Sequence, residues 1–112
     1  MGAALRFMVG VGALRWLPAG FPFATFLVNV TGCFVIGLLA AWFDRAGAGL
    51  TPRLFWLAGV LGGYTTFSTF GFETIALLRA GAPGAAALNV AGQVLLGIAA
   101  VAAGAALVRA LA

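Results

Sequence analysis

The sequence contains very few side chains that ionise or bind metal ions. Among its 112 residues there is no histidine and no lysine, and there is only one cysteine, one aspartate and one glutamate. Zinc sites and activated cysteine nucleophiles require groups of such side chains, so both kinds of site are excluded. The single cysteine, Cys33, cannot form an internal disulfide, and we interpret it as a small packing residue. We therefore expect a protein that is not an enzyme.

Charge is scarce and apolar side chains are abundant. Charged residues make up 7% of the chain, against about 25% in a soluble domain. Hydrophobic residues make up 64%, and the mean hydropathy is +1.18. The six arginines give a net charge of +4 but do not form a patch that would bind nucleic acid. The composition predicts a protein embedded in lipid, with no nucleic-acid partner.

Four apolar segments follow one another, separated by short turns that contain glycine, proline or charge. We predict spanning segments at residues 3–17, 23–43, 54–78 and 85–111 in a single domain, 1–112. Thr51 is expected to cap the third segment, with Pro52 in its first turn and plain helix from Leu54 to Leu61. The predicted fold is an all-α membrane protein with four transmembrane helices.

The third segment is unusual because its middle is polar. Gly62 and Gly63 are followed by four hydroxyl residues within five positions, at 65, 66, 68 and 69. Each glycine weakens a helix by about 1 kcal/mol relative to alanine, and hydroxyl side chains compete for backbone hydrogen bonds. We therefore predict a break near residues 62–66. Broken helices at membrane depth often mark ion or substrate sites.

Three polar side chains elsewhere are candidates for function, each with a structural alternative. Asn29, inside the second segment, is either an interhelical hydrogen-bonding group or a pore-facing amide. Arg15, near the end of the first segment, is either a topology anchor or a helix cap that adds positive potential. Glu73 is the only acid outside a loop, and it is expected to be paired, protonated or wet.

The nine residues from Gly62 to Phe70, with Glu73 three positions later, closely resemble the signature of the Fluc/CrcB fluoride channels. The Asn-x-x-Gly at 29–32 and the Gly-Ala-Leu-Arg at 12–15 are similar to the second and first helices of that family. The resemblance implies a fluoride-selective channel of the plasma membrane (the inner membrane in a bacterium) that exports fluoride passively. In the fourth segment, Asn89 and Gln93 stand near positions where the family typically carries Tyr and Ser, so the chain departs from the pattern there.

The resemblance also implies particular roles. It implies an antiparallel, dual-topology homodimer in lipid, with one central structural Na+ bound by backbone carbonyls where two broken helices cross. The implied residues are Asn29, Phe67, Phe70, Ser68 and Thr69 for the pore, Gly62 and Thr65 for Na+, and Glu73 and Arg15 for the vestibule. The residues alone leave simpler interpretations open: packing for the phenylalanines, hydrogen bonds to the preceding turn for the hydroxyls, and a kink without an ion.

Two other functions are consistent with the length and hydropathy. A small proton-coupled multidrug exporter would depend on a membrane-embedded glutamate, typically in the first helix, but the first segment here has no acid. A non-transporting subunit would have little use for a broken polar helix. Orientation is weakly specified, because four spans place four arginines (6, 45, 53 and 109) on one side and two (15 and 79) on the other.

Overall fold

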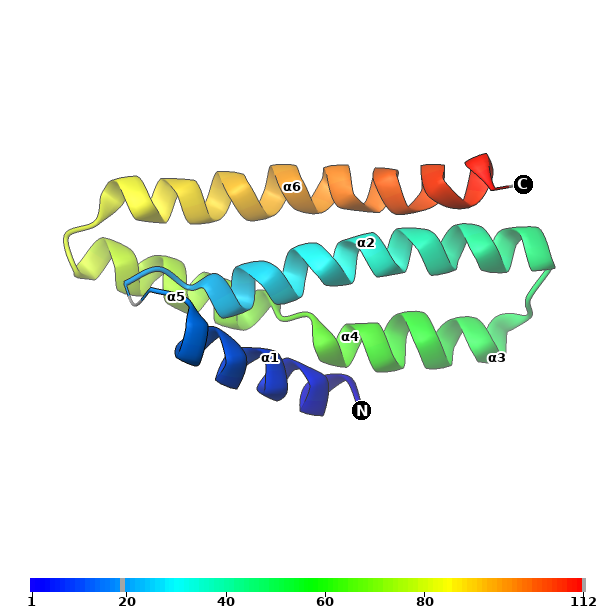
Figure 1. Ribbon diagram of the computed structural model, residues 1–112, viewed down its shortest axis with the longest axis horizontal. Helices are drawn as coiled ribbons and strands as arrows, with labels where there is room; N and C mark the ends of the chain where they lie inside the picture. Colours follow the sequence, from blue (N-terminus) through cyan, green and yellow to red (C-terminus); the bar gives the residue numbers. More distant parts are fainter. Residues whose placement is uncertain (19, 112) are drawn as a thin grey trace.

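The computed structural model describes residues 1–18 and 20–111, and this part of the chain is helical and contains no strand (Figure 1). The first three elements are α1 (Gly2–Trp16), α2 (Phe23–Ala46) and α3 (Leu50–Arg53). They are followed by the π-helix η1 (Leu54–Val60), α4 (Leu61–Tyr64), α5 (Phe67–Arg79) and α6 (Pro83–Ala110). The predicted all-helical class is confirmed, and α3 to α5 together form the third of four helical segments.

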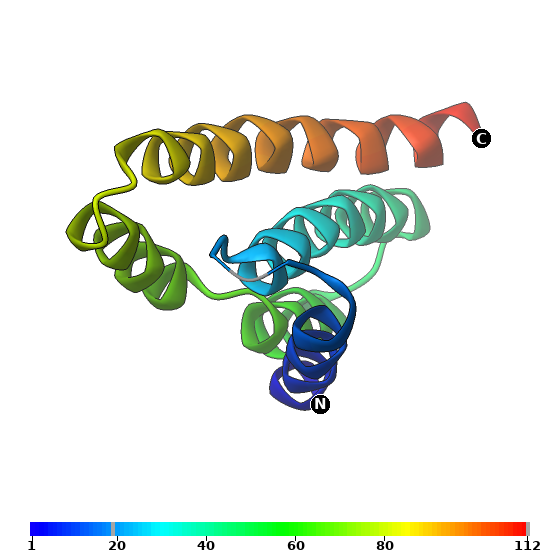
Figure 2. The same cartoon turned by 60° about the vertical axis from the view of Figure 1, so that its left-hand side comes forward.

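Helices α2 and α6 are the scaffold of the fold, and they run side by side for most of their length (Figures 1 and 2). They are also the two helices in the described residues that are long and apolar enough to cross a membrane by themselves. Gly37 on α2 lies against the backbone of Val101, and Gly104 on α6 lies against the backbone of Phe34. A side chain at either glycine would collide with the facing helix, so glycine sets the close approach.

The third segment differs from the prediction in three details. Leu54–Val60 is a π-helix and not plain α-helix. The N-cap of α3 is Gly49, and Thr51 lies inside the helix, so the predicted Thr51 cap is wrong. The two glycines at 62 and 63 remain helical within α4, and the chain leaves the helix only at Thr65 and Thr66. Glycine weakens this turn, but the hydroxyl residues after it form the break.

Helix α1 is short and packs against the broken segment. Its 15 residues span about 22 Å, less than the roughly 30 Å of a bilayer's hydrocarbon core. Gly2 is buried against the backbone of Val60 and Tyr64, so the first turn of α1 touches α4 directly. Arg15 lies in the last turn of α1 and is exposed. The N-terminal end of α1 thus lies beside the middle of the fold, close to the break (Figure 1).

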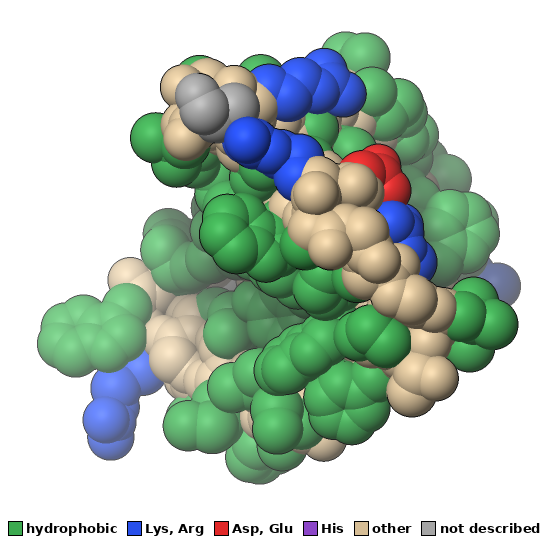
Figure 3. Space-filling model, turned by 90° about the vertical axis from the view of Figure 1, so that its right-hand side faces the viewer, with side chains coloured by type: hydrophobic (Ala, Val, Ile, Leu, Met, Phe, Trp, Pro, Cys, Tyr) green, Lys and Arg blue, Asp and Glu red, His purple; other side chains and the backbone are tan. Residues whose placement is uncertain are grey.

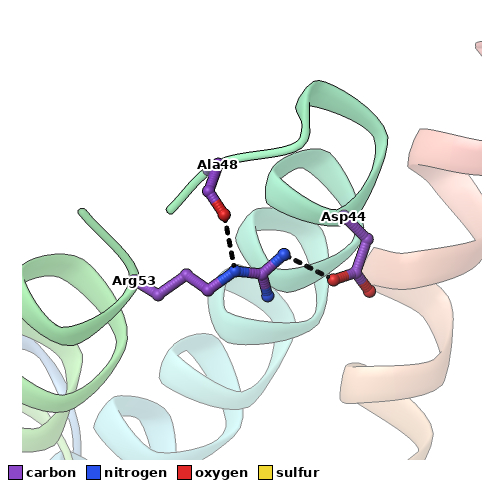
Figure 4. Close-up of polar contacts among 3 residues, drawn as sticks. All are labelled: Asp44, Ala48 and Arg53. Carbon is purple, nitrogen blue, oxygen red and sulfur yellow. Dashed lines mark hydrogen bonds and ion pairs between the residues drawn. The ribbon is translucent and has the colours of Figure 1, made fainter. Parts of the chain in front are cut away.

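Charged side chains gather at the end of the molecule that holds the α2–α3 turn and the end of α6, beside a broad hydrophobic surface (Figure 3). Arg53 forms an ion pair with Asp44 at 2.7 Å and donates from Nε to the carbonyl of Ala48 at 3.1 Å (Figure 4). Arg45 donates to the carbonyl of Val108 at 3.0 Å. These contacts close the turn between α2 and α3 and tie it to α6, as expected for the wet end of a membrane bundle.

The close approach of α2 and α6 gives a stability prediction. We expect Gly104→Val to lower the free energy of unfolding by about 1–3 kcal/mol, because the new side chain would meet the Phe34 carbonyl and the Leu38 amide. Gly84→Ala in the first turn of α6 is the matched control, because a Cβ there meets no neighbour within 4 Å. Thermal unfolding in detergent measures both variants, and equal melting temperatures would contradict close packing at Gly104.

Candidate ion pathway at the helix break

The break consists of two extended residues between two helices. Thr65 has φ −79° and ψ 158°, and Thr66 has φ −148° and ψ 113°. The Thr66 side chain caps α5 by accepting a hydrogen bond from the Thr69 amide at 3.3 Å. Thr66 is therefore both the last residue of the break and the N-cap of the second half-helix, which is the preference that hydroxyl residues show at helix starts.

Asn29 satisfies the backbone that the break exposes. In an unbroken helix the Thr66 N–H would bond to the carbonyl of Gly62. Here it donates to the Asn29 Oδ1 at 2.9 Å, and the Asn29 Nδ2 donates back to the Thr66 carbonyl at 3.1 Å. One side-chain amide thus bonds to both backbone groups of Thr66, so a helix on a different segment supports the break at membrane depth.

A cavity of about 300 Å³ lies beside the break and is lined by α2, η1, α4, α5 and α6. Phe67 and Phe70 contribute adjacent rings, with centroids 5.6 Å apart and planes tilted by 48°. Within the described residues, the lining contains no acid and no base. It comprises Asn29, Gly32, Cys33, Ile36, Leu57, Leu61, Gly62, Thr65, Thr66, Phe67, Phe70, Gln93 and Val94.

The structure brings some of the predicted site residues to this cavity and places others away from it. Asn29, Phe67, Phe70, Gly62 and Thr65 line it, whereas Ser68, Thr69, Glu73 and Arg15 are not part of its lining. Both Ser68 and Thr69 are exposed on α5, and the Thr69 hydroxyl accepts a hydrogen bond from Thr66 at 2.9 Å. The polar track implied for these two residues stays a prediction.

Glu73 is held by a hydroxyl from α2. Thr25 Oγ1 donates a short hydrogen bond to the Glu73 Oε1, and Thr25 itself is buried. The pairing links the second turn of α5 to the first turn of α2, next to the cavity but outside its lining. The carboxyl therefore has a fixed neighbour, which is consistent with a role in holding the geometry around the break.

The Gly62 and Thr65 carbonyls, which are the ligands implied for Na+, have different surroundings. The Gly62 carbonyl has lost its helical donor to Asn29, and carbonyl oxygens suit small hard cations. The Thr65 carbonyl accepts from the Arg6 guanidinium at 3.5 Å, so a positive group is already beside it. A carbonyl oxygen is a suitable cation ligand at both residues. At Thr65, a metal ion would share the carbonyl oxygen with the Arg6 guanidinium or displace the guanidinium.

Three residues at this site were not predicted from the sequence to contribute to it. They are Thr25 beside Glu73, Thr66 as the partner of Asn29, and Arg6 at the Thr65 carbonyl. The spacing of Thr25 and Asn29 was a usable signal, because residues four apart share a helix face. Thr66 gave no side-chain signal, since its contact with Asn29 is made by its backbone.

These features define a class: a small helical membrane protein whose third segment is broken beside an uncharged cavity. Residues 1–105 match the family described as CrcB-like protein, Camphor Resistance (CrcB). The chain belongs to this family. It is 48% identical over 110 residues to the "Fluoride-specific ion channel FluC" of Methylobacterium sp. (strain 4-46), covering 97% of this chain and 88% of the relative.

Two further relatives agree. The protein of the same name from Rhodopseudomonas palustris (strain BisB5) is 45% identical over 112 residues, covering 99% of this chain and 90% of the relative. The "Fluoride-specific ion channel FluC 2" of Nitrobacter hamburgensis is 46% identical over 110 residues, covering 97% of this chain and 89% of the relative. All three alignments include the broken segment, because they span nearly the whole chain.

The reciprocal bonding of Asn29 and Thr66 predicts a local loss of protection. Asn29→Ala leaves the Thr66 N–H without its partner, which costs about 1–3 kcal/mol for a buried group. We expect faster hydrogen exchange at the Thr66 amide, measured by mass spectrometry or NMR. Trp42→Phe is the control on the same helix, because Trp42 is 58% exposed and does not line the cavity. Equal exchange at Thr66 in both variants would contradict the proposed role of Asn29.

Proposed function

We propose that this protein is a fluoride-selective channel of the bacterial plasma membrane that lets fluoride leave the cell down its gradient. The observation that carries the proposal is the uncharged cavity at the helix break, where Phe67, Phe70 and Asn29 come together in a member of the CrcB family. The relatives named above are fluoride channels by name. The protein is a channel and not an enzyme.

The cavity offers what a small, strongly hydrated anion needs when it loses water. In a low-dielectric site the lost hydration has to be replaced by hydrogen-bond donors or positive potential. Aromatic ring edges carry the positive part of the ring quadrupole, and Phe67 and Phe70 bring two rings to one place. The N-terminus of α5, with its partial positive charge, begins at the same point. None of these groups carries a full charge that would trap the ion.

The arrangement supports a passive channel over a proton-coupled exporter. Such an exporter needs an acid in its transport site, and the cavity lining contains none among the described residues. Glu73 accepts a hydrogen bond from the buried Thr25 hydroxyl and lies outside the lining. A non-transporting subunit is likewise disfavoured, because a broken helix beside an uncharged cavity serves no packing purpose.

A second copy completes the site in this proposal. Phe67 lines the cavity yet is 83% exposed in the single chain, so one wall of the pathway is open. Arg6 lies beside the Thr65 carbonyl and not at a helix end, which removes it from the orientation count. The bias then falls to three arginines (45, 53, 109) against two (15, 79). A bias this small supports insertion in both directions and an antiparallel homodimer surrounded by lipid.

A structural Na+ at the centre of that dimer is part of the proposal. The carbonyls of Gly62 and Thr65 would hold it, because the break frees them from helical hydrogen bonding. When bound, the ion would supply positive charge to carbonyl oxygens that have lost their helical donors. Arg6 supplies positive charge at the Thr65 carbonyl oxygen, so in this proposal its guanidinium and the metal ion compete for that oxygen.

Transport measurements test the function directly. Purified protein reconstituted in liposomes is expected to release fluoride rapidly and chloride negligibly, followed with ion-selective electrodes and without a proton gradient. Phe70→Ile keeps the bulk but removes the ring edge, so we expect folded protein with fluoride efflux reduced roughly tenfold or more. Phe67→Ile is expected to change efflux in the same direction.

The exposed Phe72 on α5 provides the matched control for these two variants. It does not line the cavity, and Phe72→Ile should transport like the wild type. Chloride efflux as fast as that of fluoride, or fluoride efflux that needs a proton gradient, would overturn the channel assignment. Wild-type efflux in Phe70→Ile and Phe67→Ile would assign the two rings to packing alone.

Dual topology is tested by labelling from each side of the membrane. A cysteine-containing tag after residue 112, in a Cys33→Ala background, is expected to react with an impermeant reagent on both faces of sealed vesicles. Three added lysines at the C-terminus should bias insertion and lower activity, and co-expression with an oppositely biased copy should restore it. Labelling on one face only, in a fully active preparation, would exclude the antiparallel dimer.

Competition at Thr65 gives a prediction for the metal ion. We expect the melting temperature to fall when N-methyl-D-glucamine replaces Na+, and to fall further in Arg6→Met, which removes the built-in cation. Arg79→Met is the control, since Arg79 lies in the last turn of α5, away from the break. A melting temperature that is independent of Na+ in all three proteins would argue against the site.

A further inference from the structure

A chain of amide side chains runs from the helix break into α6. The Asn29 Nδ2 donates to the Gln93 Oε1 at 2.7 Å, and the Gln93 Nε2 donates to the Asn89 Oδ1 at 2.8 Å. The Asn89 Nδ2 then donates to the Thr74 hydroxyl at 3.0 Å. We call Asn29, Gln93, Asn89 and Thr74 the amide chain; it connects α2, α6 and α5 without a gap.

The direction of every bond in the amide chain is fixed from both ends. At one end the Thr66 N–H can only donate, so the Asn29 oxygen faces it. At the other end the Thr74 hydroxyl gives its proton to the Phe70 carbonyl at 2.8 Å, so it can only accept from Asn89. The two ends require the same direction, which settles amide orientations that are otherwise ambiguous.

Asn29 and Gln93 differ in how many of their side-chain N–H groups are already used in hydrogen bonds. Asn29 uses both of its N–H groups, one on the Thr66 carbonyl and one on Gln93. Gln93 uses one N–H on Asn89, and the described residues provide no acceptor for its second. Gln93 is only 8% exposed and lines the cavity, whereas Asn89 is fully buried and does not line it. The second N–H of Asn89 likewise has no acceptor among the described residues, but Asn89 lies away from the cavity, so the spare donor at the cavity is on Gln93.

We propose that the Gln93 Nε2–H, and not the Asn29 amide, is the side-chain amide donor that contacts the anion in this protein, with Asn89 as its positioning residue. The proposal rests on the fluoride function above and assigns the donor within that site. A neutral N–H that has no partner in the resting protein gains a charge-assisted hydrogen bond when an anion arrives. Asn29 would have to break a bond to the break or to Gln93 to do the same.

Gln93 is the only glutamine in the chain, so its amide can be observed by itself. Protein labelled with ¹⁵N at the glutamine side chain should give one pair of Nε2 proton signals in a nanodisc. We expect one of the two protons to shift downfield on titration with fluoride and not with chloride, while the asparagine amides of a separately labelled sample move less. This readout does not depend on transport.

Two variants in liposomes test the same assignment by flux. Gln93→Glu keeps an oxygen for Asn29 but replaces the N–H groups with negative charge, and we expect fluoride efflux to fall at least about tenfold. Asn89→Leu leaves the donor but removes its anchor, so we expect a higher half-saturating fluoride concentration with a smaller loss of maximal rate. Leu95→Met, at a 67% exposed position on the same helix, is the control and should match the wild type.

The outcomes separate this inference from the proposed function. Wild-type efflux and half-saturation in folded Gln93→Glu, or Gln93 signals that fluoride leaves unmoved in an actively conducting protein, would overturn the role of Gln93 while leaving the channel intact. Fluoride-dependent Gln93 signals in a protein that does not conduct would support the donor and overturn the channel. If Gln93→Glu does not fold, the amide signals and Asn89→Leu still decide.

Discussion

The structure depends on one constraint: a backbone that leaves the helix inside a membrane needs hydrogen-bond partners other than water. Asn29 meets this constraint at Thr66 by donating and accepting at once. The position of α2 follows from it, because its helix has to lie within hydrogen-bonding reach of the break. On α6, which packs closely on α2 through Gly37 and Gly104, Gln93 holds the Asn29 amide from the other side.

The polar interior of this protein is built almost entirely from neutral groups. The amide chain and the threonine hydroxyls supply dipoles, the aromatic rings supply quadrupoles, and the cavity lining among the described residues carries no charge. Full charges are costly at membrane depth, whereas neutral dipoles are not. The buried side-chain nitrogens and oxygens of the described residues each have at least one partner, and the spare N–H of Gln93 is the second proton of a nitrogen that already donates to Asn89.

Much of the architecture could be predicted from the sequence, because hydropathy and turn residues mark the four segments directly. The polar run at 62–73 predicted a break near residues 62–66, but it did not show which of these residues would leave the helix. The low helix propensity of glycine favoured a break at Gly62 and Gly63. The break lies instead at Thr65 and Thr66, where Asn29 provides hydrogen-bond partners from another helix. The π-helix at Leu54–Val60 has no sequence signal that we can identify, and we have no physical account of it.

The candidate site was predictable in its residue types more than in its contacts. The resemblance to the channel family implied pore roles for Asn29, Phe67 and Phe70, and these three residues line one cavity. The connection of Asn89 and Gln93 to Asn29 could not be predicted, because it depends on how α6 is rotated against α2. Arg6 was counted as a charge near a helix end, and only the packing of α1 on the break places it beside Thr65.

The hydrogen bonds between Asn29 and Thr66 restrict amino-acid substitution more strongly at position 29 than at position 66. Residue 66 contributes only its backbone to this contact, so serine, aspartate or asparagine could replace the threonine there and still cap α5. Position 29 must supply one acceptor and two donors from a short side chain, and among the twenty amino acids asparagine alone meets that requirement. Position 66 can therefore accept other residues during evolution and position 29 cannot, although both residues take part in the same pair of hydrogen bonds.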